Sequence, residues 1–224
     1  MRSAQRKNER DVKLGNNKDR DRFYRNMTME QQAMFSSIKE NVFTFCEAKA
    51  GSGKTIVTMA AMLDMLANGE ISKIIYIQKV SQRFLQNGFL PGTIEEKTNS
   101  LWTPVYDAML RLGYLPHDVN ELRLTDRLIL TTDSTLRGVN FEDAGIVIDE
   151  AENCDTETLK LIFTRVHDSC RVALIGDSVQ KDNRGNHNLD FVRYGNYLAD
   201  KIGMRVMLSK NFRGRFSQLA EEFV

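Results

Sequence analysis

Short apolar runs alternate with longer amphipathic segments along most of the 224-residue chain. Runs rich in aliphatic and β-branched residues predict six buried strands, at 42–46, 73–78, 127–131, 145–148, 172–175 and 204–208. Helical periodicity predicts helices over 28–38, 55–66, 95–112 (interrupted near Pro104), 156–166, 189–199 and from about residue 215. Strands that alternate with helices indicate βαβ units, and therefore an α/β fold with a mainly parallel sheet.

A glycine-rich stretch, AKAGSGKTIV, joins the first predicted strand to the next predicted helix. It matches the phosphate-loop pattern G-x-x-x-x-G-K-[ST], except that Ala48 stands at the first position, where alanine is tolerated if φ stays negative. In such loops the lysine contacts the β and γ phosphates and the threonine hydroxyl binds Mg²⁺. The predicted nucleotide-binding residues here are Ala50, Gly51, Ser52, Gly53, Lys54, Thr55 and Ile56.

Two acidic residues, Asp149 and Glu150, end the apolar run GIVI. Burying charge without a partner is costly, and Mg²⁺ is the natural partner beside a phosphate loop. We therefore predict that Asp149 holds Mg²⁺ through water, next to Thr55, and that Glu150 orients and polarises the attacking water. The pair favours hydrolysis of a nucleoside triphosphate over binding alone, and a solvated acidic turn is the alternative.

Two further segments follow predicted strands and are expected at the same edge of the sheet. In ALIGDSVQ, the Gln180 side-chain amide is predicted to form hydrogen bonds with the γ phosphate and the attacking water. The alternative is a plain turn, in which Asp177 caps the next segment. In MLSKNFRGRF, Arg213 is predicted to stabilise transition-state charge on the γ phosphate. An ordinary surface arginine is the alternative for Arg213.

The net charge of +1 is unevenly distributed. Residues 1–26 contain nine Lys/Arg and four Asp/Glu, a net charge of +5, which leaves −4 for the remaining residues. We expect residues 1–26 to be a basic, flexible leader, either solvated or in contact with nucleic acid phosphates, and residues 27–224 to form one ATPase domain.

No apolar run approaches the ~20 residues of a membrane span, so no membrane partner is expected. The polar N-terminus does not resemble a secretory signal. The three cysteines flank apolar segments without metal-ligand spacing, which favours buried, reduced thiols and a cytoplasmic location.

Together these segments resemble the PhoH-like ATPases, a family related to superfamily 1 helicases, from Gln31 to Arg213. The resemblance is carried by GFLPGTIEEK with PVYDAM, by LRGVNFEDAGIVIDEAEN and by GDSVQ, while NFRGR resembles the Asn-aromatic-Arg motif of superfamily 1 helicases. Three positions depart from the family: Glu152 replaces a glutamine, Val139 an arginine, and Gln78-Lys79 an Arg-Pro pair.

The resemblance implies a three-layer RecA-like P-loop NTPase core that uses ATP and Mg²⁺. It also implies RNA helicase activity and a homo-oligomer, with a hexamer as the family habit. A bacteriophage source is implied as well, in which case the compartment is the host cytoplasm. In helicases of this kind a glutamine before the first strand reads the adenine edge, and Gln31 occupies that place. Closure of a capping box with Thr28 is the alternative for Gln31.

The function expected is Mg²⁺-dependent ATP hydrolysis coupled to binding or unwinding of RNA or single-stranded DNA by an oligomer. An ATP-gated binding or assembly module without helicase activity, and a P-loop kinase acting on a small molecule, are the alternatives. The expected contacts to a nucleic acid strand come from Lys79, Arg83, Arg137 and Arg184, with Phe84, Phe89 and Trp102 either stacking on bases or packing in the core.

Overall fold

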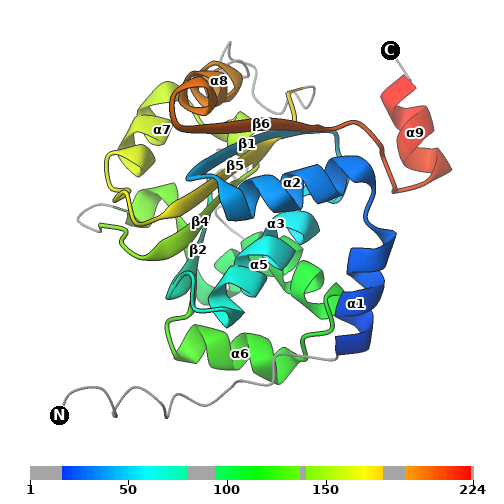
Figure 1. The fold of residues 1–224 in the computed structure, drawn as a ribbon, viewed down its shortest axis with the longest axis horizontal. Helices are drawn as coiled ribbons and strands as arrows, with labels where there is room; N and C mark the ends of the chain where they lie inside the picture. The colour runs from blue at the N-terminus through cyan, green and yellow to red at the C-terminus, as the bar shows by residue number, and fades with distance from the viewer. Residues whose placement is uncertain (1–16, 80–93, 137–139, 179–189, 223–224) are drawn as a thin grey trace.

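A six-stranded sheet forms the centre of the protein in the computed structural model, which describes residues 17–79, 94–136, 140–178 and 190–222. All its strand pairs are parallel, in the order β3-β2-β4-β5-β1-β6 (Figure 1). The strands are β1 (Phe43–Ala48), β2 (Lys73–Gln78), β3 (Leu128–Thr132), β4 (Ala144–Asp149), β5 (Arg171–Gly176) and β6 (Gly203–Leu208). The predicted α/β class is therefore confirmed.

Helices cover both faces of this sheet and make three layers. One face packs against α2 (Met29–Glu40), α3 (Lys54–Ala67), α5 (Ile94–Arg111) and α6 (Pro116–Leu124). The other face packs against α7 (Thr156–Phe163) and α8 (Asp190–Ile202). The remaining elements are α1 (Asn17–Asn26), α9 (Arg215–Glu222) and the short 3₁₀ turns η1 (Asp133–Thr135) and η2 (Ala151–Asn153).

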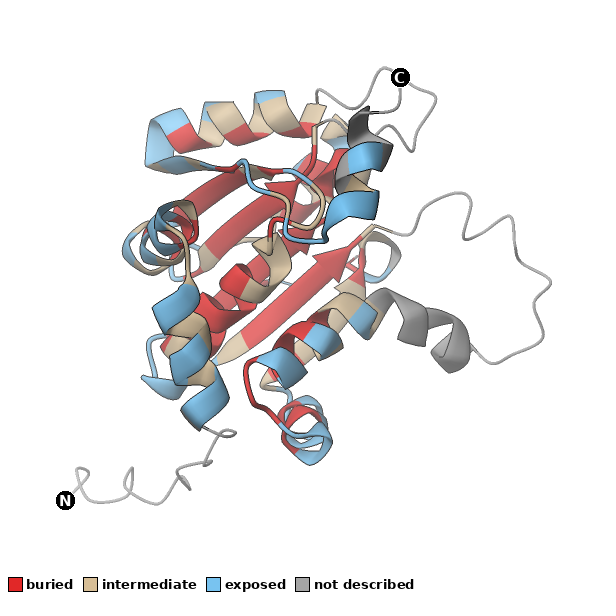
Figure 2. Ribbon diagram, turned by 90° about the vertical axis from the view of Figure 1, so that its right-hand side faces the viewer, coloured by how far each residue is buried: buried red, intermediate tan, exposed pale blue. Residues whose placement is uncertain are grey.

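The central strands are buried on both faces, as Figure 2 shows by their colour. All six residues of β4 are buried, which explains its continuous apolar run rather than an alternation of polar and apolar residues. The edge strand β6 is more exposed, and about half of the Met204 and Met207 surface remains accessible. In the described part of the chain, no helix combines the length and the apolar character needed to cross a membrane.

Three elements differ from the expectations drawn from the sequence. Residues 17–26 form helix α1, whereas a flexible leader was predicted over 1–26; residues 1–16 lie outside the described part. Phe23 and Tyr24 attach α1 to the core, and the Tyr24 ring meets the Phe35 ring of α2 edge-on, with 5.4 Å between centroids. The prediction of a flexible leader rested on the high charge of residues 1–26 and gave too little weight to these two aromatic side chains.

The other two differences concern helices. Helix α5 runs continuously through Pro104 because the turns that follow bury Val105, Ala108 and Met109 in the core, and this burial offsets the backbone hydrogen bond that proline removes. Helix α6 was not predicted at all. Pro116 at its first position, with the Asp118 carboxylate accepting from the preceding backbone N–H, was the available sequence signal.

Candidate nucleotide site

The carboxyl ends of four neighbouring strands meet at one edge of the sheet. In the order β2-β4-β5-β1, these ends carry Gln78, Asp149, Gly176 and Ala48. The loop after β1 contacts both of the other predicted motifs. The Ala50 amide donates to Asp177 Oδ2 over 2.7 Å, and the Thr55 hydroxyl donates to Asp149 Oδ2 over 2.8 Å. The structure thus brings together the phosphate loop, the acidic strand end and the start of GDSVQ.

The phosphate loop needs its two glycines. Gly51 and Gly53 have φ of +69° and +85°, in the left-handed region that side chains with a Cβ rarely adopt. Gly53 precedes α3 and supplies no side-chain cap, so the first N–H groups of that helix are available to an anion. Ala48 is a strand residue without a positive φ, as its place in the pattern requires.

Ser52, between the two glycines, supports the same interpretation. Its side chain is 1% exposed, and within the described residues its hydroxyl oxygen has no hydrogen-bond partner. A buried hydroxyl without a partner is costly, which is consistent with a phosphate group as the missing partner.

The Asp149 carboxylate is the centre of a hydrogen-bond network. Oδ2 accepts from the Thr55 hydroxyl and from the Tyr76 hydroxyl, the latter over 2.6 Å, while Oδ1 accepts from the Glu150 amide over 2.8 Å. Burial, and then the neighbouring Asp149 carboxylate, raise the pKa of Tyr76 well above its usual value, so the phenol stays protonated and acts as the donor. Sequence reasoning missed Tyr76, because nothing in a strand sequence marks a polar contact with the next strand.

The donor set around Asp149 fits Mg²⁺ held together with a nucleotide. Among the described residues there is no cluster of three or more acidic, histidine or cysteine side chains that could hold a metal ion alone. The protein would supply only two oxygen ligands, the Asp149 carboxylate and the Thr55 hydroxyl. This small number is expected when phosphates and water supply the remaining ligands of Mg²⁺.

Glu150 occupies a strained turn directly after β4. Its φ of +51° and ψ of +43° are left-handed, which costs a non-glycine residue on the order of 1 kcal/mol. Such strain is concentrated at functional sites, where the surrounding structure maintains it. The turn holds Glu150 half-buried beside Asp149, at the strand edge where the prediction placed it.

Glu152, noted in the sequence only as a departure from the family, lies buried behind the site. Glu152 belongs to η2, and its Oε2 accepts a hydrogen bond from the Asp177 backbone amide over 3.1 Å. Burial raises the pKa of Glu152 to about 7, and the backbone hydrogen bonds and the Lys54 ammonium lower it only in part. Gly176 makes room for it, since a Cβ there would lie 2.6 Å from Glu152 Oε2.

Arg213 lies against the phosphate loop of its own chain. The Phe212 amide donates to the Gly51 carbonyl over 3.0 Å, and the Arg213 amide donates to Asn211 Oδ1 over 2.8 Å. A Cβ on Gly51 would come within 2.6 Å of Arg213 Cγ, so the arginine side chain passes directly over the loop. Gly51 is therefore required both for its left-handed backbone and for this close approach.

Gln31 closes the predicted capping box. Its Oε1 accepts from the Thr28 amide over 3.1 Å, and its own amide donates to Thr28 Oγ1 over 3.2 Å. Its Nε2 donates to the Ser52 carbonyl over 3.0 Å and so fastens α2 to the phosphate loop. The capping alternative is confirmed, and a contact between the Gln31 side-chain amide and adenine stays a prediction.

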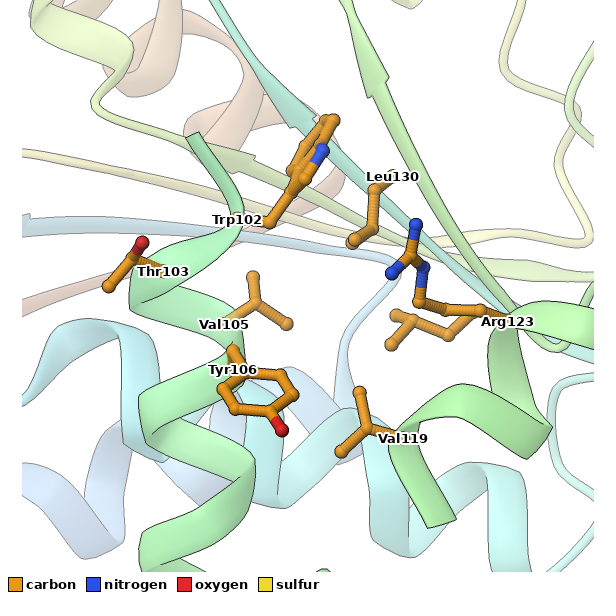
Figure 3. Close-up of a pocket in the computed structure, with 8 residues that line it drawn as sticks. Trp102, Thr103, Val105, Tyr106, Val119, Arg123 and Leu130 are labelled. Atoms are coloured by element: carbon orange, nitrogen blue, oxygen red, sulfur yellow. The ribbon is translucent and has the colours of Figure 1, made fainter. Parts of the chain in front are cut away.

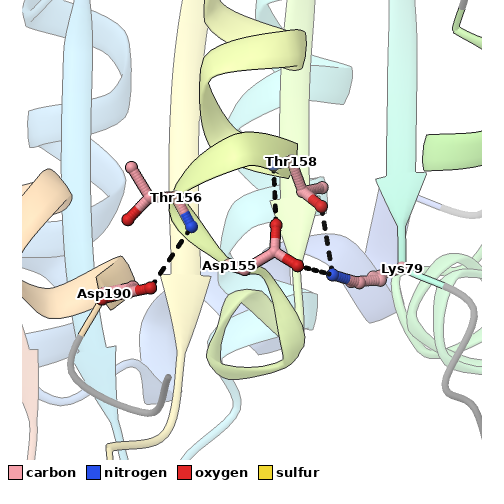
Figure 4. Close-up of polar contacts among 5 residues, drawn as sticks. All are labelled: Lys79, Asp155, Thr156, Thr158 and Asp190. Atoms are coloured by element: carbon pink, nitrogen blue, oxygen red, sulfur yellow. Dashed lines mark hydrogen bonds and ion pairs between the residues drawn. The ribbon is translucent and has the colours of Figure 1, made fainter. Parts of the chain in front are cut away.

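Lys79, predicted as a contact to nucleic acid, is engaged within the chain. Its ammonium donates to Asp155 Oδ2 and to Thr158 Oγ1, each over 3.0 Å (Figure 4). Burial raises the pKa of Asp155, but the Thr158 amide and hydroxyl and the Lys79 ammonium outweigh it and lower the pKa to about 2. Lys79 thus ties the end of β2 to the start of α7, where Asp155 caps the helix.

Several predicted residues lie outside the described part of the chain: Gln180, Arg83, Arg137, Arg184, Phe84 and Phe89. Trp102 is described, and it lines a cavity of about 230 Å³ between α5, α6 and β3 (Figure 3). Tyr106 and Val119 face the same space, with Arg123 at its side. None of the residues that line this cavity belongs to the phosphate loop or to the acidic strand end.

Comparison with solved structures agrees with this fold. The large terminase of a thermophilic bacteriophage superposes with a TM-score of 0.55 at 14% identity, covering 88% of this chain and 49% of the terminase. The UvsW helicase of bacteriophage T4 gives a TM-score of 0.51 at 13% identity, covering 86% of this chain and 67% of the helicase. At such low identity the likeness concerns the fold alone, and it confirms the predicted RecA-like core.

Similarity in sequence identifies the family as well as the fold. The PhoH-like protein of Mycobacterium leprae (strain TN) is 31% identical over 158 residues, covering 70% of this chain and 45% of that protein. The PhoH-like protein of Bacillus subtilis (strain 168) is 31% identical over 161 residues, covering 69% of this chain and 48% of that protein. The chain spans just under half the length of these relatives. A family model described as PhoH-like protein matches residues 24–211. The chain therefore belongs to the PhoH-like protein family.

Proposed function

We propose that this chain is a Mg²⁺-dependent ATPase of the PhoH type, which couples ATP hydrolysis to RNA or single-stranded DNA as a homo-oligomer. The observation that carries the proposal is the 2.8 Å hydrogen bond from the Thr55 hydroxyl to Asp149 Oδ2. It joins the phosphate loop to the acidic strand end, two segments that lie 94 residues apart in the sequence. This is the pairing expected of a magnesium nucleotide site.

In this mechanism the amides around Gly51 and Gly53 and the Lys54 ammonium bind the phosphates. Thr55 and Asp149 hold Mg²⁺, which neutralises charge on the phosphate oxygens when it is bound. Glu150, held in its strained turn, orients and polarises the attacking water.

Two more residues complete the proposed catalytic set. Arg213, which passes over the loop, stabilises negative charge that develops on the γ phosphate. The Gln180 amide bonds the γ phosphate and the water. The Gln31 side-chain amide contacts the adenine edge, since its Nε2 has two N–H groups and the Ser52 carbonyl accepts only one of them.

In the proposed coupling to nucleic acid, more than one copy of the chain contributes to each nucleotide site. A motor of the superfamily 1 type places ATP between two RecA-like domains, and the described residues supply one sheet of that type. A homo-oligomer, a hexamer by family habit, provides the second face at each nucleotide site.

One observation favours the second candidate, an ATP-gated binding or assembly module without helicase activity. Because Arg213 lies on the phosphate loop of its own chain, the site already has an arginine without a neighbouring subunit. This arrangement is compatible with hydrolysis by a monomer, and so with nucleotide control of docking instead of movement along a strand.

The test combines turnover with mass measurement. Lys54→Ala is expected to reduce ATP hydrolysis by about a hundredfold or more, and Glu150→Gln to preserve ATP binding while stopping turnover. Lys160→Ala, an exposed lysine on α7, is the matched control and is expected to turn over normally. Normal hydrolysis by Lys54→Ala or Glu150→Gln would contradict the assignment of the site.

Stimulation of the parent ATPase by RNA or single-stranded DNA, together with a larger solution mass in ATP, supports the coupled oligomer. Turnover that is indifferent to nucleic acid supports the gated module. Transfer of phosphate to a small acceptor, instead of to water, would indicate a kinase.

A further inference from the structure

Tyr76 is a buried polar residue that the catalytic scheme leaves without a role. It lies in the middle of β2 with 0% of its surface exposed, and its hydroxyl donates to Asp149 Oδ2 over 2.6 Å. In the β2–β4 register Tyr76 is paired with Val147, two residues before Asp149 on the same strand. Side chains two residues apart on a strand share a face, so the long phenol reaches the carboxylate diagonally across the two strands.

Tyr76 is more deeply buried than Thr55, whose hydroxyl also donates to Asp149 Oδ2. The Tyr76 ring packs in the apolar cluster under α3 and α5, and Trp102 of α5 meets it edge-on, with centroids 6.4 Å apart and an interplanar angle of 71°. Figure 3 shows Trp102 on its helix at the rim of the neighbouring cavity. The Thr55 hydroxyl, in contrast, lies half-buried at the start of α3 and turns about a single bond.

The hydrogen bond from Tyr76 to Asp149 does more than satisfy a buried hydroxyl, because Asp149 is the centre of a larger network. The two oxygens of Asp149 accept three hydrogen bonds, from Thr55, Tyr76 and the Glu150 amide, and Asp149 is 2% exposed. A carboxylate that binds a metal ion needs a fixed orientation, and residues that orient a ligand typically change metal affinity by about ten to a hundredfold when they are removed.

We propose that Tyr76 is a positioning residue for the metal site: its buried hydroxyl fixes the Asp149 carboxylate facing Thr55 and thereby strengthens binding of the magnesium nucleotide. This inference rests on the proposed nucleotide site. Ile74, Ile75 and Ile77 of the same strand contribute apolar packing.

The test measures metal-dependent nucleotide affinity instead of turnover. A fluorescent ADP analogue is titrated with excess Mg²⁺ and again with EDTA, and the ratio of the two dissociation constants gives the enhancement by the metal. Tyr76→Phe removes one oxygen and is expected to reduce this enhancement about tenfold, with the affinity in EDTA changed by less than about twofold.

Tyr114→Phe is the matched control, because Tyr114 is a buried tyrosine of the same apolar cluster with no contact to Asp149 among its described hydrogen bonds. Its enhancement is expected to equal that of the parent. An enhancement in Tyr76→Phe within about twofold of the parent value would overturn the inference.

A second comparison separates positioning from a general loss of packing. In an Asp149→Asn background, Tyr76→Phe is expected to have no further effect on the enhancement, because the carboxylate it orients is gone. The same tenfold loss in that background would show a role unrelated to Asp149 and would also overturn the inference.

The two proposals fail in different ways. A parent protein that binds ADP equally in Mg²⁺ and in EDTA contradicts the magnesium nucleotide site itself. A parent that shows a clear enhancement, unchanged by Tyr76→Phe, leaves the site intact and refutes only the role of Tyr76.

Discussion

Glu152 offers the most direct test of the electrostatics behind the site. Glu152 is 5% exposed, and the Asp177 backbone amide donates a hydrogen bond to its carboxyl group. Glu152→Gln keeps an oxygen acceptor for that amide and removes the charge. The substitution therefore isolates the cost of ionising a buried carboxyl group without opening a cavity.

The magnitude follows from the pKa. Burial raises the pKa of Glu152 from 4.5 to about 7 in the folded protein. Between these values the folded state keeps a proton that the unfolded state has lost, so the stability of the parent falls as pH rises from 4.5 to about 7 and is constant above. The shift corresponds to a loss of about 3 kcal/mol of stability across this pH range.

The assay is denaturant unfolding of parent and Glu152→Gln at a series of pH values from 4.5 to above 7. The two proteins are expected to be similar in stability at the low end, and the variant is expected to gain about 1–3 kcal/mol by the high end. Glu157→Gln makes the same chemical change at an exposed position of α7 and is expected to stay within about 0.5 kcal/mol of the parent throughout. A Glu152→Gln difference that is independent of pH, or that has the opposite sign, would refute the reasoning.

Two further predictions concern the phosphate loop and the start of α7. Gly51→Ala is expected to weaken nucleotide binding by more than about tenfold, measured by calorimetry, because a Cβ strains a backbone at φ +69° and collides with Arg213; an unchanged affinity would contradict the loop geometry. Asp155→Asn retains a capping side chain but loses the charge paired with Lys79. Above pH 3.8 the parent is expected to have a larger free energy of unfolding than Asp155→Asn, and this difference should disappear as pH falls towards 2. A difference that persists in acid would argue against the ion pair.

The strands and the phosphate loop could be predicted from the sequence because their signals are local. A strand buried on both faces must be apolar at nearly every position, as β4 is, and this run is visible without knowing its neighbours. The left-handed backbone at Gly51 and Gly53 likewise depends on the residues themselves. Asp149 and Glu150 could be singled out as candidate site residues because charge at the end of a buried strand is unusual in itself.

Contacts between distant segments were decided only by the tertiary structure. The order of the strands places Tyr76 diagonally from Asp149 and buries Glu152 against the Asp177 amide, and neither pair has a pattern in the chain. The same holds for Arg213, which reaches its own phosphate loop, and for Lys79, which pairs with Asp155. Sequence periodicity reports which face of a segment is apolar, but the partner of a polar side chain depends on how segments far apart in the chain pack together.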